Sequence, residues 1–449
     1  MLPAPPEASP SRLFALVDAS NFYVSCERVF RADLRQRPVV VLSNNDGCIV
    51  SRSQEVKRAG IPNGAPYFKT KRQLERMGAA VFSSNYELYG DFSRRVMEVL
   101  GTFTPDVEPY SIDEAFLVLH TPTPEDRDPA RLRALAKTIR DRVLAWTKIP
   151  VRVSIAPTKT LCKAASELAR LRGGAVSLHG LSPEAMSRAL DLVPVQDVWG
   201  VGRATARKLD ARGVKTARQL RDLSDAWVRK HLHTVGMRTV YELRGVSCIP
   251  LERAPRPRRT LMRSRSFGTP VTEPLALREA LSTHASAACA TLREEGLAAK
   301  AVQIFYHTGR HGPGPHRSAS LALPLATPTS CTDAILSAVH ALLAQSWASG
   351  DARGTPFRYK KAGVMLLDLA PSAEAQADLF SPRSPERQRL FETMDALNRR
   401  YAQPAMSPAV FLAATHLRRP GAARAWETQR NHTSPRYTTV RADLPTVRV

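Results

Sequence analysis

The sequence predicts an α+β protein of several domains, whose first part is a split β-α-β sandwich with an inserted subdomain. Strand-like and helix-like segments alternate from residue 13 to about 180, and one hairpin lies among them. Residues 182–244 then show helical periodicity without a strand pattern. Strands and helices resume at 263–369, after a linker rich in Pro and Arg. A chain of 449 residues also exceeds one ordinary hydrophobic core, which agrees with several domains.

Short apolar runs and amphipathic stretches place the elements of the first part. The expected strands are 13–17, 39–42, 107–110, 115–119, 151–156 and 175–178. The expected helices are 53–59, 91–102, 128–146 and 158–171. The turn 111–114 joins two of the strands, so these two strands form a hairpin. Farther along the chain, 334–350 reads as an amphipathic helix.

The charge of the chain points to a polyanionic partner. Lys and Arg outnumber Asp and Glu by 65 to 41, which gives a formal net charge of +24. Such an excess favours nucleic acid first and anionic lipid second. No stretch approaches the roughly 20 apolar residues of a spanning helix, so no membrane protein is expected. Six widely spaced cysteines indicate free thiols in a reduced cytoplasm. The Pro-rich residues 1–12 are expected to be a disordered extension rather than a secretory signal.

Three carboxylates stand at strand ends or turns of the predicted sheet. Asp18 ends the first strand, and Asp113 and Glu114 lie in the hairpin turn. The two elements are neighbours in a split β-α-β sheet, and convergent carboxylates repel one another unless a cation neutralises them. Mg²⁺ prefers such oxygen ligands, and two ions about 4 Å apart can assist phosphoryl transfer. Spacing alone leaves open, and slightly favours, a polar turn and a helix cap.

Two further patterns indicate phosphate contacts. Gly200 and Gly202 stand between two helical segments and precede Arg203 and Arg207, which is typical of a helix-hairpin-helix that grips nucleic-acid backbones. An ordinary helix turn is the alternative. Lys159, Lys163 and Arg170 share one face of the helix 158–171 and could hold a triphosphate. A merely solvated helix face explains these three residues equally well.

A short motif in the polar segment after residue 371 suits docking. Gln376, Leu379 and Phe380 lie within five residues of one another, a pattern that fits an apolar groove on a partner. A pattern this short also arises by chance.

Taken together, these residues resemble the UmuC family, which comprises catalytic subunits of bacterial error-prone DNA polymerase V within the Y-family translesion polymerases. The resemblance runs in family order from about residue 13 to 440. The stretches that carry it include FALVD at 14–18, FSSNYELY at 82–89, YSIDEAF at 110–116, DVWGVG at 197–202, SRSFG at 264–268, KAGVM at 361–365 and SPRYTT at 434–439. The elements YSIDE and SPRYTT are especially specific.

The resemblance implies a right-hand polymerase fold. Its expected parts are an extension 1–12, a ferredoxin-like palm 13–38 and 87–182, small fingers 39–86, a helical thumb 183–250 with the helix-hairpin-helix, a linker 251–262, an α/β little finger 263–370, and a C-terminal tether 371–449 that carries a clamp-binding motif and a UmuC-type C-terminal region.

The resemblance also implies the site. Asp18, Asp113 and Glu114, with the carbonyl of Ala19, match the ligands of two Mg²⁺ ions, for which Mn²⁺ is a possible substitute. Tyr23 matches a steric gate that excludes the 2′-hydroxyl of a ribonucleotide, and Phe22 packs beside it. The remaining matches are Lys57, Lys159 and Arg170 for the triphosphate, Gly200, Gly202, Arg203, Arg207 and Arg265 for DNA, and Gln376, Leu379 and Phe380 for the clamp. Ala377 departs from the usual clamp motif, which weakens that match.

The function implied is error-prone translesion synthesis in the SOS response, on primed damaged DNA with dNTP. The implied partners are the sliding clamp (β), a processed UmuD dimer and RecA, in the bacterial cytoplasm and at the nucleoid. Small fingers leave little surface for checking base-pair shape, so low fidelity is expected. Two rivals stay open: a nucleotide cyclase, which has no use for the Gly200–Gly202 turn, and a non-catalytic scaffold, which would have lost a metal carboxylate.

Overall fold

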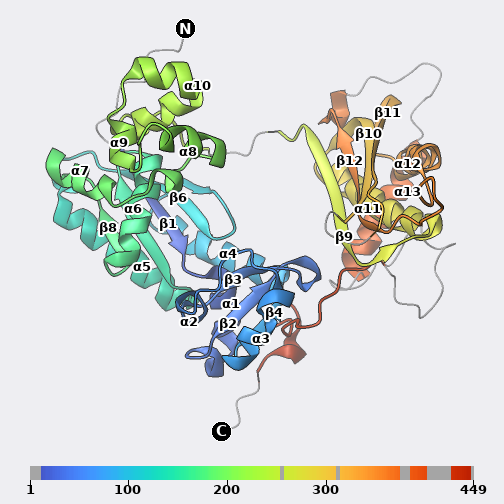
Figure 1. Ribbon diagram of the computed structural model, residues 1–449, viewed down its shortest axis with the longest axis horizontal. Helices are drawn as coiled ribbons and strands as arrows, with labels where there is room; N and C mark the ends of the chain where they lie inside the picture. Colours follow the sequence, from blue (N-terminus) through green and yellow to red (C-terminus); the bar gives the residue numbers. More distant parts are fainter. Residues whose placement is uncertain (1–11, 253–256, 310–313, 375–384, 402–425, 446–449) are drawn as a thin grey trace. The chain divides into compact units, whose positions relative to one another are not determined.

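The structure is a computed structural model that describes residues 12–252, 257–309, 314–374, 385–401 and 426–445. The chain divides into two compact units (Figure 1). The first comprises residues 1–43, 48–255 and 432–449, and the second comprises 44–47 and 256–431. No helix in the described ranges is long and apolar enough to cross a membrane.

A five-stranded sheet in the order β5-β6-β1-β7-β8 forms the centre of the first unit. Its strands are β1 (Arg12–Ala19), β5 (Val107–Pro109), β6 (Glu114–His120), β7 (Val151–Ala156) and β8 (Ala175–Ser177). The middle strand, β1, runs antiparallel to both β6 and β7. Alternate residues of β1 enter two different cores, Ala15 on one face and Leu16 on the other. The predicted strands and the predicted hairpin are confirmed.

Helices cover both faces of this sheet. On the face of Ala15 pack α1 (Phe22–Phe30), α4 (Tyr86–Gly101) and α5 (Pro129–Thr147), and α6 (Lys159–Leu171) packs on the face of Leu16. Asp128 caps α5 by accepting hydrogen bonds from the backbone N–H of Ala130 and Arg131, and Thr158 caps α6 through Leu161 N–H. These caps explain why the predicted helix starts at 128 and 158 are correct to within one residue.

The segment between α1 and α4 folds as a small subdomain. Its sheet has the order β3-β2-β4, with β2 (Val39–Leu42), β3 (Ile49–Arg52) and β4 (Ala80–Ser83), and its helices are α2 (Gln54–Arg58) and α3 (Tyr67–Arg76). Val40, Leu42 and Leu74 lie in its own core. Apolar runs and helical periodicity predict β2 and α2 but not β3, β4, α3 and α1. Strand β3 carries Ser51 and Arg52, so its polar pattern hides it from an apolar-run criterion.

Residues 183–243 are helical, as predicted. The helices are α7 (Pro183–Asp191), α8 (Arg203–Asp210), α9 (Ala217–Arg221) and α10 (Asp225–Leu243). The carboxylate of Glu242, near the end of α10, accepts hydrogen bonds from Thr160 N–H at 3.0 Å and from Cys248 N–H at 2.6 Å. This buried carboxylate therefore fastens α10 to the first turn of α6.

The second unit is a four-stranded antiparallel sheet in the order β11-β10-β12-β9, covered by two helices. The strands are β9 (Thr260–Val271), β10 (Leu297–Thr308), β11 (Ser318–Thr329) and β12 (Tyr359–Leu367), with the short β13 (Ala370–Pro371) paired to β10. The covering helices are α11 (Pro274–Glu294) and α12 (Thr332–Ser346), of which α12 matches the amphipathic helix predicted near 334–350. The helix α13 (Pro385–Tyr401) is held by an ion pair between Arg293 and Asp395.

The last described segment, 432–445, belongs to the first unit although more than 330 residues separate it from the elements it touches. It runs beside α3 and β4 (Figure 1). The carbonyl of His432 accepts from Ser83 N–H at 2.9 Å, and the ring of Tyr437 stacks on Phe30 with centroids 4.5 Å apart. The segment is thus packed into the protein core at Tyr437.

Candidate functional site

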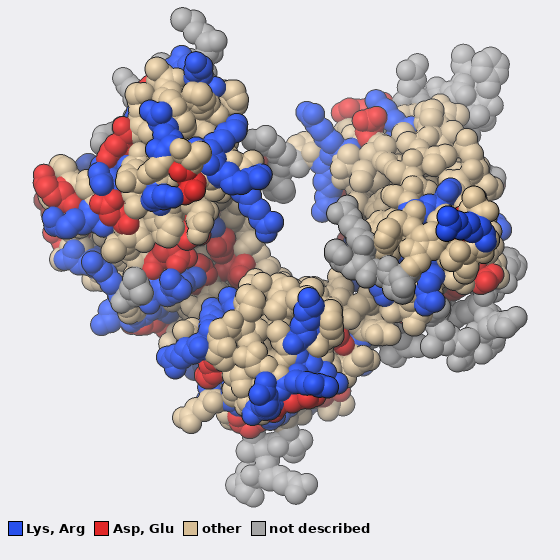
Figure 2. All heavy atoms as spheres, in the orientation of Figure 1, with Lys and Arg blue, Asp and Glu red and all other residues tan. Residues whose placement is uncertain are grey.

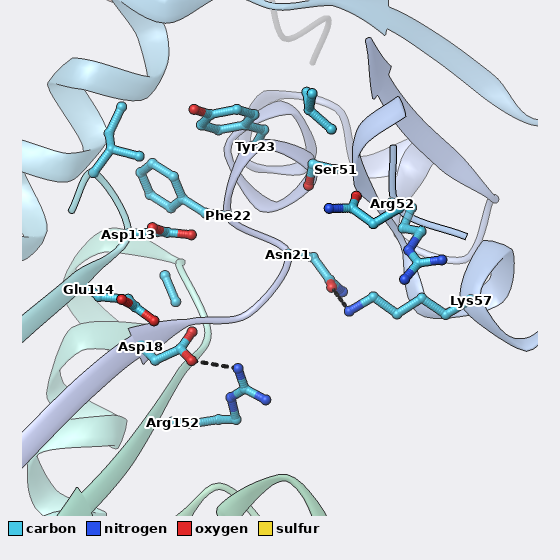
Figure 3. A pocket seen from close by; sticks show the side chains of 14 residues that line it. Asp18, Asn21, Phe22, Tyr23, Ser51, Arg52, Lys57, Asp113, Glu114 and Arg152 are labelled. Atoms are coloured by element: carbon cyan, nitrogen blue, oxygen red, sulfur yellow. Dashed lines mark hydrogen bonds and ion pairs between the residues drawn. The ribbon is translucent and has the colours of Figure 1, made fainter. Parts of the chain in front are cut away.

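A pocket of about 490 Å³ opens where β1 ends, between the sheet of the first unit and its small subdomain (Figure 3). The polar residues of its lining come from five separate stretches of the chain. They are Asp18, Asn21, Tyr23, Ser51, Arg52, Lys57, Asn63, Asp113, Glu114 and Arg152. Acidic and basic side chains therefore meet in one concave site, which is the usual setting of a phosphate-handling active site.

Strand register brings the three predicted carboxylates together. Asp18 on β1 lies directly opposite Glu114, the first residue of β6. Ala19 N–H donates to the carbonyl of Asp113 at 2.8 Å, which fixes Asp113 beside the same strand end. Side chains of Asp18, Asp113 and Glu114 all face the pocket (Figure 3). The convergence expected from the hairpin is therefore present.

Two basic side chains hold these carboxylates. Arg152 pairs with Asp18 at 2.6 Å, and Lys163 pairs with Glu114 at 2.6 Å. Burial raises the pKa of Asp18, and the negative charges of Glu114 and Asp113 raise it further, although Arg152 acts against them. A divalent cation bound beside Asp18 would offset the repulsion that raises its pKa.

The donor set fits Mg²⁺, because it consists of three carboxylates and a nearby backbone carbonyl at Ala19. In the described part of the chain, no group of three or more His, Cys, Asp or Glu side chains already stands in metal-binding geometry. The ion pairs explain this, since Arg152 and Lys163 direct two of the carboxylates toward themselves. Binding of an ion would therefore involve exchange of these partners.

Two aromatic rings stand beside the carboxylates at the start of α1. Phe22 and Tyr23 both line the pocket (Figure 3). The ring of Tyr23 stacks on Tyr89 of α4, with centroids 4.3 Å apart and an angle of 12° between the planes. Asn21, in the left-handed region with φ 50°, makes the turn that brings both rings to the pocket.

Basic residues form the opposite wall of the pocket. Lys57 on α2 donates to the side-chain oxygen of Asn21. Burial lowers the pKa of Lys57, and the positive charges of Arg52, Arg152 and Arg170 lower it further. Mutual repulsion among these cations means that an anion bound between them would be stabilised. Arg170, on α6, is exposed and contributes to the same field.

The predicted triphosphate role of Lys159 is wrong. Its side chain is buried, pairs with Glu108 of β5 and donates to the carbonyl of Pro250 at 2.8 Å. The helical face was identified correctly, but the first turn of α6 lies beneath α10, whereas Lys163 one turn later reaches the pocket edge. Sequence spacing cannot distinguish these two depths.

Five polar residues of the pocket were not predicted from the sequence, namely Asn21, Ser51, Arg52, Asn63 and Arg152. A signal for Arg152 exists, because it interrupts the apolar strand 151–156 with a charge. Its register position opposite Asp18 explains that interruption. Asn21 and Arg52 have no comparable signal, since polar residues at turns and edge strands are common.

The predicted DNA contacts lie on both units. Gly200 has φ 93°, and a Cβ there would come within 2.9 Å of Thr239 Oγ1, so the turn requires glycine. Gly202 is the N-cap of α8, where Arg203 and Arg207 are exposed. Lys and Arg side chains are prominent on the visible face of the α8–α10 region (Figure 2). Arg265 is exposed on the edge strand β9 of the second unit, and Gln376, Leu379 and Phe380 lie outside the described residues.

Comparison with known families settles the identity of the fold and the family. Residues 17–167 match the model of the impB/mucB/samB family, and residues 258–379 match the C-terminal domain of that family. The protein UmuC of Salmonella typhimurium is 42% identical over 96% of this chain and 99% of its own length. The chain belongs to the UmuC family. Residues 388–447 match a domain of unknown function.

Other relatives and solved structures agree. MucB of Escherichia coli is 37% identical over 86% of this chain and 90% of its own, and a DNA polymerase IV of Alkalilimnicola ehrlichii is 30% identical over 81% and 98%. A solved Y-family polymerase chimera, Dbh-Dpo4-Dbh, covers 79% of this chain and 98% of itself with a TM-score of 0.62 at 18% identity. That likeness shows the fold. The predicted UmuC-family, Y-family polymerase fold is therefore confirmed, and the family is one of DNA-directed DNA polymerases.

Proposed function

We propose that this protein is an error-prone translesion DNA polymerase of the SOS response, which adds dNMP to a primer 3′-hydroxyl opposite damaged DNA with two Mg²⁺ ions. The observation that carries the proposal is the register of β1 and β6, which sets Asp18 opposite Glu114 and beside Asp113 in a pocket that also holds an aromatic ring and several cations. Family membership supports the reaction class.

Asp18, Asp113 and Glu114, with the carbonyl of Ala19, would hold the ions, and Mn²⁺ would be accepted by the same oxygens. Bound cations there would supply charge neutralisation for the primer hydroxyl and the leaving pyrophosphate. Arg152 and Lys163 hold two of the carboxylates through ion pairs before substrate arrives, and an ion bound at these oxygens would take the place of these partners.

The opposite wall of the pocket would bind the incoming nucleotide. Lys57, Arg52 and Arg170 would contact the triphosphate, because their charges converge on the same space. Tyr23 would lie under the deoxyribose, where its ring leaves no room for a 2′-hydroxyl, and Phe22 supports it. The pocket would then select dNTP over rNTP by steric exclusion.

The basic surfaces would bind primed DNA through phosphates. In the first unit these contacts are the backbone of the Gly200–Gly202 turn and the side chains of Arg203 and Arg207, and in the second unit Arg265. We further propose that Gln376, Leu379 and Phe380 bind the sliding clamp, and that a processed UmuD dimer and RecA assist at the bacterial nucleoid. These partners follow from the family resemblance.

Primer extension tests the proposal. Purified protein with Mg²⁺ and dNTP is expected to extend a primer on undamaged and abasic templates, alone or with UmuD dimer, RecA and clamp. Asp113→Asn should abolish extension in every mixture. Formation of cyclic nucleotide from free NTP, without template-dependent extension, would instead indicate a nucleotide cyclase. Unchanged extension by Asp113→Asn would contradict the assignment of the carboxylates.

A further inference from the structure

The position of the Tyr23 ring depends on a second ring behind it. Tyr89 of α4 is completely buried and stacks on Tyr23 with a centroid distance of 4.3 Å. Tyr86 meets both rings edge-on, at 6.2 and 6.3 Å. One face of the Tyr23 ring is thus supported by Tyr89. Any movement of Tyr89 changes the space available at that side of the pocket.

A buried carboxylate fixes Tyr89 in turn. The phenol of Tyr89 donates a hydrogen bond of 2.7 Å to Oε1 of Glu27, one helical turn after Tyr23 on α1. Glu27 is fully buried, and its Oε2 has no hydrogen-bond partner within the described ranges. Its Oε1 accepts hydrogen bonds from the hydroxyl groups of Tyr89 and Ser434, and Arg31 acts on it through charge. Glu27 is consequently sensitive to the loss of either hydroxyl.

The second hydroxyl comes from the far end of the chain. Ser434 is buried and donates to Glu27 Oε1 at 3.1 Å, while Asn85 Nδ2 donates to Ser434 Oγ at 3.0 Å. The hydrogen bonds of His432 with Ser83 hold one side of Ser434 in place, and the stacking of Tyr437 on Phe30 holds the other. The segment 432–437 lies within the stretch that matches a domain of unknown function.

We propose that the C-terminal segment 432–437 is a positioning element of the nucleotide pocket, which fixes the Tyr23 ring through Ser434, Glu27 and Tyr89 and so sharpens selection against ribonucleotides. The inference rests on the proposed function, in which Tyr23 excludes the 2′-hydroxyl. Ser434 and Tyr89 are positioning residues, because neither lines the pocket. Loss of one hydroxyl would let Tyr89 shift and the Tyr23 ring retreat.

Single-nucleotide insertion by the full-length chain separates this role from a purely structural one. The quantity measured is the ratio of kcat/KM for dCTP to that for rCTP opposite template dG. Ser434→Ala and Tyr89→Phe, on two different elements, should each lower this ratio by about three- to tenfold, the effect of one neutral hydrogen bond. Thr439→Ala, which removes an exposed hydroxyl two residues beyond this segment, should leave the ratio unchanged.

A loss of folded protein lowers kcat for both nucleotides alike and leaves the ratio at the wild-type value. Ratios within twofold of wild type for both Ser434→Ala and Tyr89→Phe would therefore overturn the inference. Tyr23→Ala is the reference: it should reduce the ratio far more than either variant. If Tyr23→Ala changes the ratio and the two variants do not, only the positioning role fails. If Tyr23→Ala also leaves the ratio unchanged, the gate assignment fails and the inference falls with it.

Discussion

Two lysines one turn apart on α6 have carboxylate partners in opposite surroundings. Lys159 and Glu108 form a pair whose side chains are 2% and 9% exposed. Lys163 and Glu114 form a pair at the pocket edge, with 17% and 22% exposed. The sealed pair also binds the backbone of Pro250 and Glu252, and so ties the chain that leaves the helical region to the central sheet. The open pair can exchange its partners.

The difference teaches how burial separates structural charges from functional ones. A buried pair is worth little compared with apolar packing, but removal of one member leaves an uncompensated charge in a poorly polarisable environment. A partly exposed pair can be replaced by water, by an ion or by a substrate group at low cost. Helical spacing alone assigns both lysines to the same face, so only their depth reveals their different roles.

The largest effect is expected from a change to a carboxylate that faces the pocket. Asp18→Asn removes one negative charge from the pocket and leaves Arg152 without its ion-pair partner. Primer extension should fall at least about a thousandfold, since charge stabilisation of the transition state is lost. Steady-state insertion kinetics measure it, and Asp141→Asn, an exposed residue of α5, serves as the control. Activity within tenfold of wild type would contradict the proposal that Asp18 holds the metal ions.

The sealed side should respond in stability. Lys159→Met leaves Glu108 buried without its cation, and we expect a loss of about 3 kcal/mol or more in the free energy of unfolding. Lys163→Met should cost about 1 kcal/mol or less, because its partner is partly exposed. Urea titrations of both variants make the comparison directly. Equal losses would show that burial does not distinguish the two pairs.

The sequence was sufficient for the central sheet and for the carboxylates. Apolar runs locate its strands, and the order of strands and hairpin already places Asp18 beside Asp113 and Glu114. Local patterns carry this information because register follows from the alternation of buried side chains. The roles proposed for Tyr23 and Lys57 come from the family resemblance, because composition and spacing do not indicate them.

The burial of individual side chains and the contacts between distant parts of the chain could not be predicted from the sequence. Nothing local to Lys159 shows that α10 covers it, since that contact depends on Glu242, more than 80 residues away. The partnership of Glu27 with Ser434 spans 407 residues. Only tertiary packing creates such contacts, so the SPRYTT motif alone does not show that this segment packs against α1.

Glu27 extends the comparison to a carboxylate that is sealed but held by hydroxyl groups. Burial raises the pKa of Glu27 from its ordinary 4.5 to about 7, against the opposing effects of its bonds to Tyr89 and Ser434. Between these pH values the folded protein keeps a proton that the unfolded chain has released. Stability from this group is therefore fully present below pH 4.5 and is lost as the pH rises through about 7.

Glu27→Gln should remove that dependence. Between pH 4.5 and a pH above 7, the wild type should lose about 3 kcal/mol of unfolding free energy relative to the variant. Urea titrations at four or five pH values measure it. A difference that stays constant across this range would mean that Glu27 titrates as an exposed carboxylate, despite its burial.

The smallest effect is expected on α8, where Arg203 and Arg207 are exposed. If Arg203 and Arg207 contact phosphates, each neutralises about one charge of DNA and releases counterions. Arg203→Gln and Arg207→Gln should each reduce the slope of log K against log salt by about 0.9 for primed duplex, with little change in template sequence preference. Arg133→Gln, exposed on α5, is the matched control. Because a lost phosphate contact changes the salt dependence itself, slopes equal to the control would exclude direct phosphate binding by these two arginines.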